Sequence, residues 1–137
     1  MVIKKLLVAI VDDELDIVTL FRDALNRIRG LSIFTFTDPL TAFDHIRMNK
    51  GKYAVVISDL RMPGINGMDL IYKIKKENPL IRTLLMTAFE VDDKVFEEYV
   101  KNKIIDGFLQ KPLKLRALES EVHKQIDIYK QSSSNKR

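Results

Sequence analysis

Carboxylates in two places are the side chains of this sequence best suited to chemistry. Asp12, Asp13 and Glu14 stand side by side, and Asp59 follows the apolar run 55–57 and one serine. Carboxylates packed together repel one another unless a cation lies among them, and Mg²⁺ prefers such oxygen ligands. A carboxylate can also act as a nucleophile and form an aspartyl phosphate. Because aspartate is equally common where a strand ends in a turn, the surrounding elements must decide between these interpretations.

Apolar segments of strand length alternate with segments of helical period along the chain. A continuous Val/Ile run is typical of a strand buried on both faces, and apolar residues at steps of three and four indicate an amphipathic helix. The expected strands are 5–11, 31–37, 55–59, 82–87 and 106–112, and the expected helices are 14–29, 38–49, 67–77, 91–100 and 115–129. This alternation predicts an α/β fold with a parallel sheet covered on both faces.

Polar side chains stand at the carboxyl ends of four expected strands. The acidic cluster follows the first strand, Asp59 ends the third, Thr87 ends the fourth and Lys111 follows the fifth. The carboxyl ends of parallel strands share one edge of the sheet, where α/β proteins bind their ligands. A lysine can act as a point charge on a phosphoryl oxygen, and a threonine hydroxyl can donate a hydrogen bond to another. The spacing therefore predicts one cleft that combines a magnesium site with a phosphoryl acceptor.

The composition excludes several other kinds of site. The chain has 137 residues, enough for one domain. It has no cysteine, so thiolate metal sites and disulfides are ruled out, and His45 and His123 lie at no metal-ligand spacing. The net charge is +4, but the basic residues are scattered and no nucleic-acid-binding motif is present. No apolar run is long enough for a membrane span and no signal peptide is evident, so we expect a cytoplasmic protein.

Four short motifs resemble those of the response-regulator receiver domain of two-component signalling. They are Val-Asp-Asp-Glu at 11–14, Ser-Asp-Leu-Arg-Met-Pro-Gly-Ile-Asn-Gly at 58–67, Met-Thr-Ala at 86–88 and Leu-Gln-Lys-Pro-Leu at 109–113. The resemblance implies a doubly wound (βα)5 fold, similar to flavodoxin, with five parallel strands in the order 2-1-3-4-5. It also implies a receiver domain over residues 1–129, which leaves 130–137 as a flexible, basic, Ser-rich tail.

The resemblance further implies roles for individual residues in phosphorylation. Asp59 would be the phosphoacceptor, and Mg²⁺ (or Mn²⁺) would be held by Asp12, Asp13, Asp59 and the backbone carbonyl of Arg61. A sensor histidine kinase or a phosphotransfer protein would donate the phosphoryl group. The domain would assist its own phosphorylation and dephosphorylation without being an enzyme in the usual sense.

A second group of residues would couple phosphorylation to a change of surface. By resemblance, Lys111 would bind the phosphoryl group, Thr87 would move toward it, and Phe108 would be the aromatic switch residue. The bond between Lys111 and Pro112 would be cis, which is physically reasonable because proline follows it. The face formed by the fourth helix, fifth strand and fifth helix would then bind a downstream protein, and a phosphorylation-dependent homodimer is a further option.

Two alternatives to a stand-alone receiver remain open at this stage. The chain could be the receiver of a longer regulator whose output domain binds DNA or is an enzyme, although the sequence itself contains no helix-turn-helix. It could instead be a phosphatase that uses an aspartyl phosphate. Such an enzyme needs an acid/base carboxylate two residues after the acceptor, where this chain has Arg61. A flavin-binding protein would need a phosphate loop after the first strand, where the acidic cluster stands.

Overall fold

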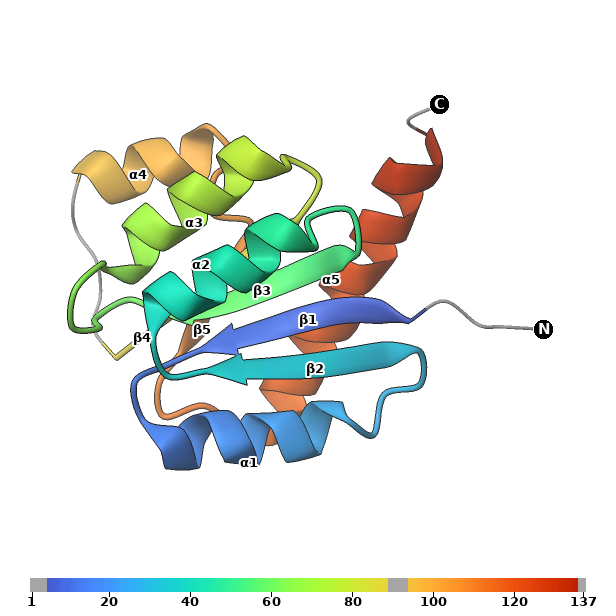
Figure 1. Ribbon diagram of the computed structural model, residues 1–137, viewed down its shortest axis with the longest axis horizontal. Helices are drawn as coiled ribbons and strands as arrows, with labels where there is room; N and C mark the ends of the chain where they lie inside the picture. The colour runs from blue at the N-terminus through green and yellow to red at the C-terminus, as the bar shows by residue number, and fades with distance from the viewer. Residues whose placement is uncertain (1–4, 89–93, 136–137) are drawn as a thin grey trace.

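The computed structural model describes residues 5–88 and 94–135, which form five strands and five helices in alternation (Figure 1). All strands pair in parallel, in the order β2-β1-β3-β4-β5. This order confirms the predicted doubly wound fold. The strands are β1 (Leu6–Val11), β2 (Leu31–Phe36), β3 (Tyr53–Asp59), β4 (Arg82–Thr87) and β5 (Gly107–Gln110).

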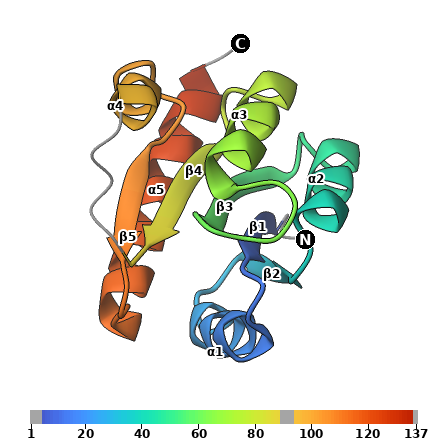
Figure 2. The same cartoon turned by 90° about the vertical axis from the view of Figure 1, so that its left-hand side faces the viewer.

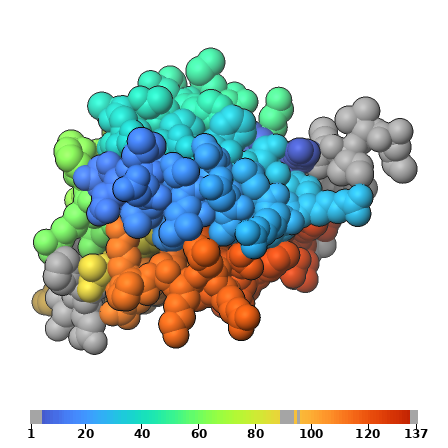
Figure 3. All heavy atoms as spheres, turned by 90° about the horizontal axis from the view of Figure 1, so that it is seen from below, coloured from blue at the N-terminus to red at the C-terminus, as the bar shows by residue number. Residues whose placement is uncertain are grey.

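The helices cover the sheet in two layers, as the turned view shows (Figure 2). Helices α1 and α5 lie on one face, where they pack side by side (Figure 3), and α2, α3 and α4 lie on the other. The helices are α1 (Leu15–Leu25), α2 (Pro39–Met48), α3 (Gly67–Glu77), α4 (Lys94–Lys101) and α5 (Leu115–Asn135).

Alternate residues of the central strands enter different cores. In β1, Val8 and Ile10 pack with α1 and α5, whereas Ala9 and Val11 pack with α2 and α3. Every residue of β3 is buried, which is the physical reason why its sequence is a continuous apolar run. The rigid middle of the sheet therefore holds the carboxyl ends of β1 and β3 in a defined relation.

Several helix boundaries follow from local hydrogen bonds. Asp38 caps α2, because its carboxylate accepts a hydrogen bond from the backbone amide of Thr41 at 3.0 Å. Asn66 caps α3 in the same way through the amide of Asp69, at 2.9 Å. These two caps set the directions in which α2 and α3 leave the loops after β2 and β3.

Helix α1 ends at Leu25, four residues earlier than the predicted end at Arg29. The amide of Ile28 bonds to the carbonyl of Leu25 at 3.0 Å, so the chain tightens into a turn after the helix. Gly30, with φ +88°, then leads into β2, and its carbonyl accepts a hydrogen bond from Leu6 at 2.9 Å. The turn before β2 is therefore held by its hydrogen bond to β1, and α1 ends before the helical spacing of apolar residues does.

The boundaries of the last two helices also differ from those predicted. Helix α5 continues to Asn135, so most of the segment expected as a flexible tail from residue 130 is helical. The hydroxyls of Ser133 and Ser134 donate to carbonyls three residues earlier, which lets serines continue the helix. Helix α4 begins at Lys94, and the predicted first turn at 91–93 lies outside the described residues.

Candidate functional site

Three carboxylates meet at the carboxyl edge of the sheet. Asp12 follows β1 and is completely buried, Asp59 ends β3 and is 9% exposed, and Asp13 is exposed to solvent. One carboxylate oxygen from each of these residues lies within 4.8 Å of the others. The predicted acidic group is therefore assembled by the pairing of β1 with β3, although 47 positions separate Asp12 from Asp59 in the sequence.

The ammonium group of Lys111 lies between two of these carboxylates. Its Nζ is 3.0 Å from Oδ2 of Asp12 and 3.3 Å from Oδ1 of Asp59. Lys111 follows β5, and its backbone amide donates to the carbonyl of Thr87 at 2.8 Å, which ties the ends of β4 and β5 together. The Lys111–Pro112 peptide bond is cis, as the resemblance implied.

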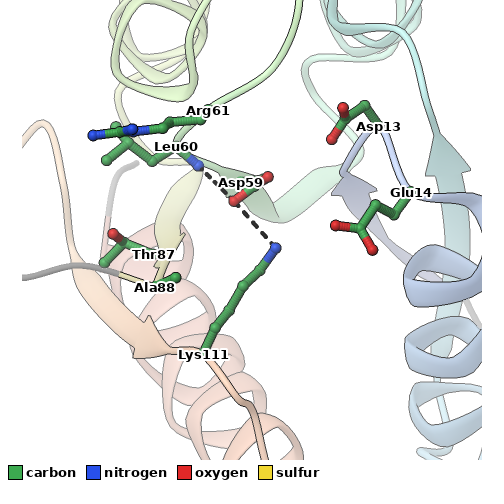
Figure 4. A pocket seen from close by; sticks show the side chains of 8 residues that line it. All are labelled: Asp13, Glu14, Asp59, Leu60, Arg61, Thr87, Ala88 and Lys111. Atoms are coloured by element: carbon green, nitrogen blue, oxygen red, sulfur yellow. Dashed lines mark hydrogen bonds and ion pairs between the residues drawn. The ribbon is translucent and has the colours of Figure 1, made fainter.

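An open cavity of about 250 Å³ lies over Asp59. Thr87 and Lys111 line one side and Asp13 and Glu14 the other, as the side chains in Figure 4 show. Thr87 is 8% exposed, so it lies at the wall of the cavity with its side chain largely covered. The cavity opens the Asp59 carboxylate to solvent.

Backbone amides that sequence reasoning missed hold two of the carboxylates. The amide of Leu60 donates to Oδ1 of Asp59 at 3.0 Å, and the amide of Glu14 donates to Oδ1 of Asp12 at 3.0 Å. In both cases an aspartate at a strand end accepts from a residue one or two positions later. An aspartate at a strand end can be recognised in the sequence. Its hydrogen bond to a following backbone amide can be assigned only when the loop conformation is known.

The loop after β3 folds back closely onto the end of its strand. The amide of Gly67 donates to the carbonyl of Leu60 at 2.8 Å, and a Cβ atom at Gly67 would lie 2.1 Å from the carbonyl oxygen of Asp59. Gly64, with φ +89°, makes the turn within this loop. Glycine at position 67 is therefore needed for the approach that positions Asp59.

Burial and neighbouring charges shift the pKa values of the two central groups. Burial raises the pKa of the Asp59 carboxyl above its usual range, the charge of Asp12 raises it further, and Lys111 opposes the shift. For Lys111, burial favours the neutral amine, but the hydrogen bond and charge of Asp12, together with Asp59, outweigh burial and raise the pKa. Lys111 therefore remains an ammonium group beside a carboxylate that is costly to ionise.

The donor set fits a hard divalent cation. The cluster offers carboxylate oxygens alone, and Lys111 contacts two of its three members. Mg²⁺ is commonly held by one or two carboxylates while it keeps several waters, and the exposed Asp13 and the open cavity leave room for such waters. The residues present therefore match the magnesium site expected for a receiver.

Phe108 lies on β5, outside this cluster. Its side chain is 40% exposed, and its ring packs on that of Phe96 from α4, with centroids 4.8 Å apart. Arg61 is exposed at the rim of the cavity, on the side of Thr87 and Leu60 (Figure 4). The structure thus brings together Asp12, Asp13, Asp59, Thr87 and Lys111 and places Phe108 at the surface between β5 and α4.

Comparison with known families gives the identity of this arrangement. The sequence profile of the response regulator receiver domain matches residues 8–123, which include the strand ends that form the cluster. The chain belongs to the response-regulator receiver domain family. Receiver domains are the signalling modules of two-component systems, and the observed strand order is that of the receiver fold.

The receiver domain is similar to parts of longer regulators. It is 30% identical over 122 residues to the DNA-binding transcriptional regulator NtrC of Klebsiella pneumoniae. That alignment covers 89% of this chain and 25% of NtrC. It is 27% identical over 133 residues to the cyclic di-GMP phosphodiesterase response regulator RpfG of Xanthomonas campestris, with coverages of 95% and 34%. The chain therefore spans about a quarter to a third of the length of these relatives.

Solved structures show the same fold. An uncharacterized protein from Neptuniibacter caesariensis is 28% identical, with a TM-score of 0.83 and coverage of 98% of this chain and 97% of that one. A CheY-like receiver domain protein from Methanospirillum hungatei has a TM-score of 0.82 at 18% identity, and the match covers 94% of this chain and 99% of that one.

None of the helices described for this receiver domain combines the length and the apolar character that a membrane span requires.

Proposed function

We propose that this receiver domain is switched by phosphorylation of Asp59 in a reaction that depends on Mg²⁺. The observation that carries the proposal is the position of the Lys111 ammonium group, within 3.3 Å of the Asp59 carboxylate and beside an open cavity. A carboxylate that is held by a backbone amide, next to a fixed cation and open to solvent, is arranged to receive an anionic group.

The proposed transfer forms one bond and breaks one bond. An Asp59 carboxylate oxygen attacks the phosphorus of a phosphohistidine or a small acyl phosphate, and the bond from phosphorus to the donor atom breaks. The donor atom keeps the electron pair, and a histidine donor takes a proton from solvent. Lys111 would contact an oxygen of the transferred group, because its ammonium group already lies beside the acceptor.

The chain's own carboxylates would hold the metal. Asp12, Asp13 and Asp59, with the backbone carbonyl of Arg61, are the proposed ligands, and the cation when bound would supply positive charge against the transferred oxygens. Without a cation, burial and the charge of Asp12 oppose ionisation of Asp59 by raising its pKa. We therefore expect phosphorylation to require a divalent ion, either Mg²⁺ or Mn²⁺.

The response to phosphorylation would pass through Thr87 and Phe108. Thr87 lines the same cavity as Asp59, so its hydroxyl can move toward an added phosphoryl oxygen. Phe108 packs on Phe96, so an inward rotation of Phe108 would break the aromatic contact between β5 and α4. The expected result is a population shift that changes the α4-β5-α5 surface offered to a downstream protein.

The similarity to longer regulators favours a second arrangement. NtrC is named as DNA-binding and RpfG as a cyclic di-GMP phosphodiesterase, and this chain matches only 25% and 34% of their lengths. In such a protein the same surface would contact an output domain rather than a separate target. In either arrangement we propose that this protein acts in the cytoplasm and that a sensor histidine kinase or a phosphotransfer protein is the donor.

The test is incubation with acetyl phosphate, followed by intact-mass measurement. With Mg²⁺ we expect the mass to increase by one phosphoryl group, and with a chelator we expect no increase. Asp59→Asn should abolish the gain, whereas the control Asp44→Asn, on the exposed part of α2, should retain it. Labelling that persists in Asp59→Asn would place the chemistry on another residue and refute the assignment.

A further inference from the structure

The edge of the sheet opposite the candidate site collects basic side chains that are scattered in the sequence. Because all strands are parallel, the segments that precede them share one edge. Five exposed basic side chains there, which we call the basic edge, are Lys5, Arg27, Arg29, Lys52 and Lys130. Hydrogen bonds place the segments together, since Leu6 donates to Gly30 and Leu7 donates to Lys52.

The positive charge of the basic edge is not balanced locally. None of its five side chains forms an ion pair with any residue that the structure describes. Nearby acids are committed elsewhere, because Glu77 pairs with Lys50 at 3.5 Å and Asp106 is buried with Lys75 and Arg82. Asp127 is the acidic residue that lines the same region.

A cavity of about 290 Å³ opens within the basic edge, between the turn after α1 and the second half of α5. Part of its wall is apolar and is formed by Leu6, Ile28, Leu31 and Ile126. The rest is polar and includes the cations Arg29 and Lys130, on different elements, together with His123 and Asp127. The cavity therefore offers an apolar surface beside two cations, at the far end of the domain from the acidic cluster.

We propose that the basic edge binds an acidic protein segment that inserts one apolar side chain into this cavity. Carboxylates of the segment would pair with Arg29 and Lys130, and the apolar side chain would cover the wall formed by Ile28 and Ile126. A nucleic-acid backbone would use the charges but would leave the apolar side chains of the cavity uncovered. The opposite, acidic end of the domain would repel the same segment and so orient it.

The test uses the full chain and a fluorescent dodecapeptide of alternating Glu and Asp with one central Leu. Anisotropy should show saturable binding that is at least about fivefold tighter than for the same peptide with Ser in place of Leu, because burial of one apolar side chain strengthens binding. Arg29→Glu and Lys130→Glu should each weaken binding by about fivefold or more. Asp127→Asn should strengthen it. Backbone NMR shifts on titration should centre on Leu31 and Ile126.

Matched controls separate this surface from general charge and from the phosphorylation site. Arg116→Glu reverses an exposed charge in the first turn of α5 and should leave peptide affinity within about twofold. Acetyl-phosphate labelling should persist in Arg29→Glu, so failure of one proposal is distinguishable from failure of the other. The proposal is overturned if a DNA duplex or phosphatidylserine vesicles bind more tightly than the Leu peptide, if Arg116→Glu weakens binding as much as Arg29→Glu, or if no saturable peptide binding occurs.

Discussion

At the scale of single residues, the site depends on placing a carboxylate where it is costly to ionise. Asp59 is nearly buried and lies close to Asp12, and the Lys111 ammonium group compensates for only part of this cost. When it is ionised and no cation is bound, such a group destabilises the fold. The free energy of folding and the chemistry of the site are therefore opposed at Asp59.

Removing the charge of Asp59 should stabilise the protein at neutral pH in a metal-free buffer. The pKa of Asp59 is higher in the folded state than in the unfolded chain, so its contribution to stability is present below the unfolded pKa and is lost as the pH rises through the folded pKa. We expect Asp59→Asn to melt at a higher temperature than the parent at pH 7. The difference should shrink as the pH falls toward the ordinary aspartate range near 4.

Thermal unfolding followed by circular dichroism, in steps between these pH values and with a chelator present, measures this effect. Asp44→Asn serves as the control, because Asp44 is exposed on α2 and pairs only with Arg47 at 3.6 Å. An Asp59→Asn protein that is less stable than the parent at pH 7 would show that the bonds to Lys111 and Leu60 outweigh the cost of the charge.

A single added methyl group should disturb the acceptor through the backbone. In Gly67→Ala the new Cβ would lie 2.1 Å from the carbonyl oxygen of Asp59, so the loop or the strand end must move. We expect a loss of about 1–3 kcal/mol in the free energy of unfolding, measured by urea denaturation, and slower labelling by acetyl phosphate. Gly51→Ala, where a Cβ meets no atom within 4 Å, should change neither quantity appreciably.

At the scale of elements, a buried ionic network joins segments at the amino edge of the sheet. Asp106, just before β5, lies 2.7 Å from Nζ of Lys75 on α3 and 3.4 Å from the guanidinium group of Arg82 on β4. Arg82 also donates to Gln125 of α5 at 2.8 Å. The network links α3, β4, β5 and α5, whereas α4 contacts its neighbours through rings such as those of Phe96 and Tyr99.

Breaking this network should be costly because it leaves the partly buried cations Lys75 and Arg82 without the carboxylate that balances their charge. We expect Asp106→Ala to lower the free energy of unfolding by about 3 kcal/mol or more, as is usual when one member of a buried ion pair is removed. Burial already lowers the pKa of Lys75, and Asp106 offsets part of that shift. Urea denaturation would measure the loss, and Asp127→Ala, on the exposed side of α5, should cost well under 1 kcal/mol. Equal costs for the two variants would contradict the role given to Asp106.

At the scale of the whole molecule, the domain is electrically polarised along its strands. Carboxylates gather at the carboxyl edge, and the basic edge lies at the other end. The small net charge of +4 conceals this separation. A divalent cation and an acidic protein segment would therefore be attracted to opposite ends of the same domain, which keeps their sites independent.

Binding of Mg²⁺ should raise the stability of the whole fold, because the folded chain alone brings the three carboxylates together. At a concentration one hundred times the dissociation constant the gain is about 2.7 kcal/mol, which differential scanning calorimetry would detect as a higher melting temperature. Asp13→Asn removes one proposed ligand and should reduce the shift, whereas Asp16→Asn, on the exposed first turn of α1, should retain it. An equal shift in both variants would mean that the ion binds elsewhere.

The sequence by itself determined the class of fold and which polar residues meet at one edge of the sheet. Buried parallel strands require continuous apolar runs, and the polar residues that end them can lie only at one edge. For this reason Asp12, Asp59, Thr87 and Lys111 could be placed together before any distance was known. The cap at Asp38 was equally predictable, because it depends on a hydrogen bond within four residues.

The tertiary structure alone decided what depends on contacts between distant segments. It made Asp12 buried and its neighbour Asp13 exposed, ended α1 at the turn that pairs with β1, and continued α5 to Asn135. It also gathered lysines and arginines from four separate stretches of the sequence into one basic edge. The physical reason is that local spacing specifies which face of an element a residue occupies. The burial of a side chain, its distance from other residues and the distribution of charge over the surface arise from how whole elements pack.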